Sequence, residues 1–287
     1  MCDDDIHPGL IVNPAVSRRT FGLMTVAAAG VAGSARAGVP VVEKEVDVKT
    51  PDGVADAVLY HPEGKGKWPA VLIWTDVVGL RQAFRDMGRR LAGEGYVVLV
   101  PNPYYRVKRS PVIEGSFDFS KPEDRAKLGP LRASLTPDGV DRDAAAYVAF
   151  LDTQPQTHRK KKVGVQGYCM GGPLSFRTAA AAPGRIGGVA SFHGGGLFTD
   201  QPTSPHLLLP KTRAEYLIAV ADNDHKQDPT VKDKLGAALA AAGRPHRIEV
   251  YTGANHGWCV PGSAIYNEVA AEKAWAGLLA LYRRTLG

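Results

Sequence analysis

The chain alternates short apolar runs with longer segments in which apolar residues recur at helical spacing. The short runs are rich in Val, Ile, Leu and aromatic residues, and most begin directly after a glycine, a proline or a charged residue. An apolar run of this length with such boundaries predicts a buried strand. Strands are therefore predicted over Ala70–Trp74, Tyr96–Pro101, Lys162–Gln166, Ile186–Phe192, Tyr216–Ala221 and Arg247–Tyr251.

The segments of helical periodicity lie between these strands. In Asp141–Gln154, for example, Ala145, Val148 and Leu151 fall on one side of the predicted helix. Further helices are predicted over Arg81–Glu94, Pro173–Ala179, Pro229–Ala242 and Ile265 to about Thr285. Alternating strands and helices predict an α/β protein with a doubly wound, mostly parallel sheet and helices on both faces.

Two other segments complete the predicted domain. Glu43–Lys49 and Val54–Tyr60 flank the turn sequence Pro51-Asp52-Gly53 and predict a β-hairpin. Asn102–Pro137 is polar, contains proline and is longer than an ordinary connection, so we expect a cap or a substrate loop there. Residues 38–287 have the size of one large α/β domain with its own core.

The first 37 residues have the composition of an export signal. Ser17-Arg18-Arg19-Thr20-Phe21 resembles a twin-arginine motif, a weakly apolar run follows, and Ala35-Arg36-Ala37 supplies a cleavage pattern of small residues. The apolar run is shorter than the ~20 residues that a spanning helix needs. We therefore expect residues 1–37 to be a signal peptide for the twin-arginine translocation machinery, a periplasmic location, and no stable membrane anchor.

Charge and cysteine content narrow the classes of partner. The net charge is +6, but the basic residues are spread along the chain, which argues against a nucleic-acid partner. Only Cys169 and Cys259 lie beyond the predicted signal peptide, so no disulfide framework is expected, and we expect both thiols to stay reduced. No familiar metal or cofactor motif occurs, and we predict neither a metal nor a cofactor.

The sequence Gly167-Tyr168-Cys169-Met170-Gly171 lies between a predicted strand and a predicted helix. Glycines on both sides of a nucleophile at this place are typical of a nucleophile elbow, a strained turn that leaves no room for side chains beside the nucleophile. Cys169 is therefore the candidate nucleophile. The backbone N–H of Met170, at the start of the helix, is the candidate donor to an oxyanion.

Candidate partners for the thiol follow two later strands. Asp222-Asn223-Asp224-His225 forms an acidic turn after the strand that ends at Ala221, and His256 follows the strand that ends at Tyr251. Open α/β sheets keep catalytic groups at the carboxyl ends of their strands. His256 is thus the candidate base, and either Asp224 or Asp222 could hold its imidazole in one tautomer.

These motifs together resemble those of the dienelactone hydrolases (carboxymethylenebutenolidases), the cysteine branch of the α/β-hydrolase superfamily. The resemblance covers about all of residues 38–287 and rests on the elbow, on Asp224-His225, on Asn255-His256-Gly257 and on Pro101–Arg106. It implies an α/β-hydrolase fold, a catalytic triad of Cys169, Asp224 and His256, and an ester or lactone substrate. Asp224 is favoured over Asp222 by this match.

The resemblance also suggests roles around the triad. Asp76 stands where the family has a glutamate that activates the thiol, and the N–H of Val77 would be the second oxyanion donor. Arg125 matches an arginine that binds a substrate carboxylate, and Tyr105 and Trp258 are further candidates for substrate binding. The family's other carboxylate-binding arginine is replaced by Val260.

His193-Gly194-Gly195-Gly196 is similar to an oxyanion-loop motif. Because it follows the elbow in the chain instead of preceding it, we expect only a tight turn between a strand and a helix.

Three functions are compatible with these residues. The first is a cysteine hydrolase of esters, lactones or thioesters that resembles dienelactone hydrolase. The second is a general carboxylesterase or thioesterase of the same fold, with Trp258 and Val260 lining an apolar pocket. The third is a non-hydrolytic binding or thiol-redox protein that uses Cys169 and Cys259 as a pair. A redox pair needs neither Asp224 nor His256, which argues against the third.

Overall fold

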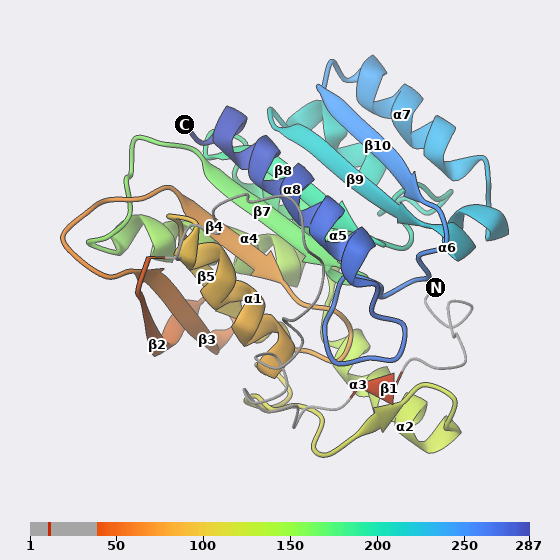
Figure 1. Cartoon of the computed structure of the whole chain (residues 1–287), viewed down its shortest axis with the longest axis horizontal. Coiled ribbons are helices and arrows are strands. Elements are labelled where there is room, and N and C mark those ends of the chain that lie inside the picture. The colour runs from red at the N-terminus through yellow and green to blue at the C-terminus, as the bar shows by residue number, and fades with distance from the viewer. Residues whose placement is uncertain (1–10, 13–38) are drawn as a thin grey trace, which may run out of the picture.

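The computed structural model describes residues 11–12 and 39–287. Its main feature is an eight-stranded sheet of order β10-β9-β8-β7-β4-β5-β3-β2 (Figure 1). The strands are β2 (Val41–Thr50), β3 (Gly53–Pro62), β4 (Ala70–Trp74), β5 (Val97–Pro101), β7 (Val163–Tyr168), β8 (Ile186–Phe192), β9 (Glu215–Ala221) and β10 (His246–Tyr251). The pairs from β10 to β5 are all parallel, while β3 and β2 are antiparallel additions at one edge.

Helices cover both faces of the sheet, as the alternating pattern predicts (Figure 1). α1 (Gln82–Gly93) and α8 (Glu268–Thr285) pack on one face, where they bury a cluster that includes Phe84 and Leu278. The other face is covered by α4 (Pro137–Thr153), α5 (Gly171–Ala181) and α7 (Val231–Ala241). Because both faces are covered, β4, β5 and β7 are buried along their whole length, and all their residues except Gln166 are apolar.

The hairpin predicted around Pro51-Asp52-Gly53 is present and pairs in continuous register from Val41–Pro62 to Thr50–Gly53. Gly53 has a φ of +143°, which a residue with a side chain rarely adopts. The hairpin closes the β5 edge of the sheet, so the carboxyl ends of the parallel strands remain as the place for a site.

The long segment between β5 and α4 folds as a small separate layer below that end of the sheet (Figure 1). It contains β6 (Phe117–Asp118), α2 (Pro122–Ala126) and α3 (Leu128–Ala133), and β6 pairs with β1 (Ile11–Val12). A third apolar cluster joins this layer to the loop after β4; its buried members are Val77, Val78, Tyr104, Ile113, Phe117, Leu128 and Leu131. The layer therefore packs directly on the loop that carries Asp76.

Two local predictions are wrong. His193 does not begin a tight turn into an α-helix, because an irregular segment continues to Ser204 and is followed by a 3₁₀ helix, η1 (Pro205–Lys211). The acidic residues after β9 do not form a simple turn but the first turn of a short helix, α6 (Asp222–Gln227).

The predicted signal peptide, residues 1–37, lies outside the described residues except for Ile11 and Val12 in β1. Among the helices of the described part of the chain, none is long and apolar enough to cross a membrane.

Candidate active site

Cys169 follows β7 directly and stands on a sharp turn into α5. Its φ of +51° lies in the left-handed region, which is strained for a residue with a side chain. A Cβ atom on Gly167 would collide with the backbone of Gly171, and one on Gly171 would lie 2.6 Å from the carbonyl oxygens of Trp74 and Thr75. The two glycines are thus required by backbone packing, and the turn presents the half-buried Cys169 thiol at the end of the sheet.

His256 reaches the same place from the loop after β10. Its Nδ1–H donates to Oδ2 of Asp224 at 2.8 Å, and its backbone N–H donates to Oδ1 of Asn223 at 2.7 Å. Asp224 and Asn223 both lie in α6, so this short helix holds the histidine at two points. Asp222 instead accepts from Lys226 at 2.7 Å. The geometry therefore pairs His256 with Asp224.

The imidazole of His256 also interacts electrostatically with the side chain of Cys169. Burial disfavours the imidazolium, but the interaction with Cys169 and the hydrogen bond with Asp224 outweigh burial and raise the pKa of His256 well above its ordinary value. The three side chains thus form one connected chain from thiol to imidazole to carboxylate, and the imidazolium is the favoured partner of a thiolate.

The two residues predicted to donate to an oxyanion, Met170 and Val77, lie next to Cys169 in the chain or line the same cavity. Met170 is the N-cap of α5, and Val77 lies in the loop after β4 and lines the same cavity as Cys169. Neither amide N–H donates a hydrogen bond to any residue of the described chain. The hydroxyl of Tyr104 lies 2.8 Å from the carbonyl oxygen of Val77 and 3.0 Å from Sδ of Met170, so it joins the two segments.

Asp76 forms a bidentate ion pair with Arg81, with Oδ1–Nη1 and Oδ2–Nη2 distances of 2.6 and 2.7 Å. Its Oδ1 also accepts from the backbone N–H of Val78 at 3.0 Å. Both side chains are largely buried, at 13% exposure for Asp76 and 6% for Arg81. The carboxylate therefore fixes the loop after β4, and it also lines the cavity next to Cys169.

The cavity at the thiol has a volume of about 20 Å³. Its lining residues come from four loops and the elbow; they are Asp76, Val77, Arg81, Phe119, Cys169, His193, His256, Gly257, Val260 and Ser263. Val260 lines it as the sequence suggests. Sequence reasoning assigned no role to His193, although the His-Gly-Gly-Gly pattern marked its position.

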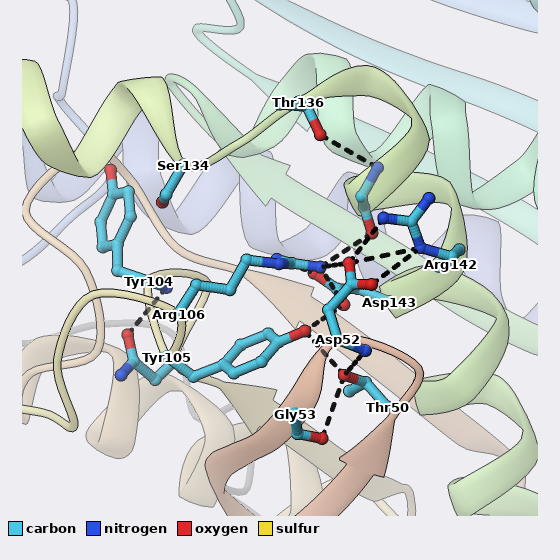
Figure 2. A network of polar contacts seen from close by, with 12 residues as sticks. Thr50, Asp52, Gly53, Tyr104, Tyr105, Arg106, Ser134, Thr136, Arg142 and Asp143 are labelled. Atoms are coloured by element: carbon cyan, nitrogen blue, oxygen red, sulfur yellow. Dashed lines mark hydrogen bonds and ion pairs between the residues drawn. The ribbon is translucent and has the colours of Figure 1, made fainter.

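Three predicted substrate-binding residues lie elsewhere. The hydroxyl of Tyr105 is hydrogen-bonded to Thr50 and Asp143, both at 2.7 Å, in a network with Arg106 (Figure 2). Burial raises the pKa of Tyr105 to about 12. Arg125 donates to the carbonyl of Phe119 at 2.9 Å and holds the segment between β6 and α2.

Trp258 is completely buried and stacks on Tyr251, with ring centroids 5.0 Å apart. None of the side chains of Tyr105, Arg125 and Trp258 lines the cavity at Cys169. Whether any of them contacts a substrate stays a prediction.

Cys259 and Cys169 line different cavities. Cys259 faces a larger, apolar one of about 330 Å³ between α1 and α8, whereas Cys169 faces the small one beside His256. Both thiols are free. Burial raises the pKa of the Cys259 thiol well above its usual range, which keeps it protonated. Within the described residues, no group of three or more His, Cys, Asp or Glu side chains could hold a metal ion.

A thiol on a strained turn, followed in the chain by an acid and a histidine at strand ends, has the arrangement of the α/β-hydrolases. The comparisons agree with this class. A protein from Klebsiella pneumoniae assigned as a dienelactone hydrolase superposes with a TM-score of 0.73 at 22% identity, covering 85% of this chain and 99% of that one. The protein therefore has the α/β-hydrolase fold.

The family model for the dienelactone hydrolase family matches residues 55–286, and the chain belongs to that family. A Synechocystis sp. protein assigned as a carboxymethylenebutenolidase is 27% identical over 231 residues, which are 79% of this chain and 91% of that protein. A dienelactone hydrolase-like promiscuous phosphotriesterase from metagenomic libraries superposes with a TM-score of 0.65 at 21% identity, covering 86% and 99% of the two chains. The protein is accordingly a hydrolase.

Proposed function

We propose that this protein hydrolyses carboxylic ester or lactone bonds of small molecules through a triad of Cys169, His256 and Asp224. The observation that carries the proposal is the strained elbow at Cys169 beside an imidazole that Asp224 holds at 2.8 Å. A protein that only binds its ligand does not need a nucleophile, a base and an orienting acid in contact with one another.

The first half of the reaction forms a thioester. The Sγ of Cys169 attacks the carbonyl carbon of the substrate, and the resulting oxyanion accepts hydrogen bonds from the N–H groups of Met170 and Val77. The C–O bond to the leaving group then breaks, and the leaving oxygen takes the proton from Nε2 of His256. Asp224 stabilises the imidazolium while it exists.

The second half releases the acid. Water attacks the thioester carbonyl and gives one proton to Nε2 of His256, and the C–S bond breaks. The products are a carboxylic acid and the Cys169–His256 pair in its starting state. For a lactone both products are parts of one molecule, because the leaving alcohol stays attached to the acyl group.

The lining of the cavity favours substrates without a carboxylate at the reacting centre. The one arginine among the lining residues, Arg81, is neutralised by its bidentate pair with Asp76. Val260 and Phe119 add apolar surface. A simple ester or neutral lactone therefore suits this site better than an acidic dienelactone, and Arg125→Met should leave turnover of neutral esters unchanged.

Turnover of a chromogenic acetate ester tests the proposal. We expect Cys169→Ala and His256→Ala to abolish turnover while circular dichroism stays that of the wild type. Cys259→Ala is the matched control, because it removes the other thiol from a separate cavity and should keep full activity. Undiminished turnover in Cys169→Ala would rule out the thiol mechanism.

We also propose, from the sequence of residues 1–37, export to the periplasm by the twin-arginine route. Replacing Arg18 and Arg19 together by lysine should retain the full chain in the cytoplasm, measured by cell fractionation and immunoblotting. Normal export of this double variant would contradict the proposal.

A further inference from the structure

His193 is a buried histidine beside the triad. It follows β8, has a φ of +40°, and is only 1% exposed. Its ring centroid lies 4.7 Å from that of His256, and it lines the cavity that Cys169 and His256 also line. His193 therefore combines a strained backbone with a buried polar ring, and it does so next to the candidate nucleophile.

Both ring nitrogens of His193 lack a hydrogen-bond partner among the described residues. A buried polar group without a partner destabilises the fold, and the strained backbone of His193 destabilises it further. The edge of Trp258 lies against the ring, with centroids 5.2 Å apart. Aromatic contacts thus hold the ring in place, and its nitrogens can form hydrogen bonds with a molecule bound in the cavity.

The charge state of His193 is set by its surroundings. Burial, and then the positive charge of His256, lower the pKa of His193 well below its usual value. The imidazole ring of His193 is therefore uncharged near pH 7. A neutral imidazole has one nitrogen that donates and one that accepts a hydrogen bond.

The size of the cavity indicates which molecule it can hold. A cavity needs about 10–15 Å³ to hold one water molecule, and the water needs two or more polar partners. The cavity at Cys169 measures about 20 Å³ and has His193 and His256 in its wall. Its dimensions and polarity thus suit a single water next to the thiol.

We propose that His193 holds the water molecule that hydrolyses the acyl-enzyme. This role rests on the proposed function, since it concerns the second half of that reaction. The water gives one hydrogen to Nε2 of His256 and points its other hydrogen at the unprotonated nitrogen of His193, so that a lone pair of its oxygen faces the thioester carbon.

The step balances without any further reactant. The new C–O bond forms as the C–S bond breaks, the proton taken by His256 stays on its imidazole and pairs with the departing Cys169 thiolate, and the second hydrogen remains on the product acid. His193 gains and loses nothing, since it only accepts a hydrogen bond. With His256 as its sole anchor the water could rotate, and a misplacement of about 1 Å costs on the order of 10²-fold in rate.

The test compares acylation with deacylation in the full-length chain. His193→Phe keeps an aromatic ring and removes both nitrogens. His193→Asn keeps polar groups and tolerates a positive φ better than most residues. His206→Phe is the matched control, because His206 is a histidine that does not line the cavity at Cys169. Rapid mixing with p-nitrophenyl acetate gives the acylation rate, and quenched intact-mass spectra give the fraction of acetylated enzyme during turnover.

We expect His193→Phe to acylate at close to the wild-type rate, to deacylate about 10–100-fold more slowly, and to accumulate acetylated enzyme. Added hydroxylamine, which attacks the thioester without a positioned water, should restore its turnover. His193→Asn should lie between the wild type and His193→Phe, and it carries the test if the phenylalanine variant does not fold.

The outcomes separate this inference from the proposed function. Equal slowing of acylation and deacylation, or an unchanged deacylation rate in both variants, would overturn the role of His193 alone. Absence of any acetylated wild-type enzyme during turnover would instead overturn the thiol mechanism on which the role depends.

Discussion

Removing the carboxylate of Asp76 should destabilise the fold strongly. In Asp76→Ala the guanidinium of Arg81 loses both hydrogen bonds of a bidentate pair, at 2.6 and 2.7 Å. The guanidinium cannot turn to solvent without disturbing its neighbours, because the Arg81 side chain is 6% exposed and lies over the ring of Phe84. The variant therefore leaves a buried, uncompensated positive charge.

The size of the effect follows from that burial. Removing one partner of a buried ion pair costs about 3–5 kcal/mol, whereas an exposed pair contributes about 0–1 kcal/mol. Arg90 and Glu272 form such an exposed pair, with side-chain exposures of 43% and 49%, so Glu272→Ala is the matched control. The double variant Asp76→Ala/Arg81→Met replaces the pair by apolar groups and should recover most of the lost stability.

Urea denaturation followed by circular dichroism gives the free energy of unfolding of each variant. A loss below about 1 kcal/mol in Asp76→Ala, equal to that of Glu272→Ala, would refute the assignment of Asp76 to a buried ion pair. A role in activating the thiol makes a separate prediction. Folded Asp76→Asn should then react more slowly with iodoacetamide at Cys169 than the wild type does.

Three further predictions concern the site. Asp224→Asn should lower the pKa of His256, seen by NMR titration of its ring protons, and should reduce kcat/KM on the order of 10³–10⁴-fold, while Asp222→Asn should stay active. The folded state lowers the pKa of His193 below its unfolded value near 6.5, so the unfolded chain takes up a proton more readily. The contribution of His193 to the free energy of unfolding is therefore present above about pH 6.5 and is lost as the pH falls. Between about pH 7.5 and 5, the wild type should lose on the order of 1–2 kcal/mol more than His193→Phe in urea denaturation. Gly171→Ala should cost about 1–3 kcal/mol or more, because its new methyl group meets two carbonyl oxygens at 2.6 Å, and a thermal midpoint equal to that of the wild type would contradict this packing.

The sheet and the order of the candidate residues could be predicted because they depend on local signals. The apolar runs, the hairpin turn and the glycines of the elbow each fix a short stretch of backbone, and the carboxyl ends of parallel strands meet at one edge. These signals point to Cys169 and His256 but leave Asp224 and Asp222 open, and only the family resemblance favours Asp224; the structure brings Cys169, Asp224 and His256 together.

The remaining features depend on contacts between segments far apart in the chain. The pairing of Asp76 with Arg81, instead of with the thiol, depends on how the loop after β4 closes on α1. The motif positions of Arg125 and Tyr105 do not reveal that Nη1 of Arg125 donates to the carbonyl of Phe119, or that the Tyr105 hydroxyl donates to Asp143. The burial of His193 follows from the packing of β8, the β10 loop and Trp258, which no spacing along the chain reveals.

The central claim is that Cys169 carries the acyl group during turnover. Mixing the protein with p-nitrophenyl acetate, quenching in acid and mapping the peptides by mass spectrometry tests it most directly. We predict one acetyl group per chain, on Cys169, that disappears when the ester is exhausted and is absent from Cys169→Ala. Steady hydrolysis without an acetyl group on Cys169 would contradict the account. So would an acetyl group on another residue that forms and disappears at the rate of ester hydrolysis.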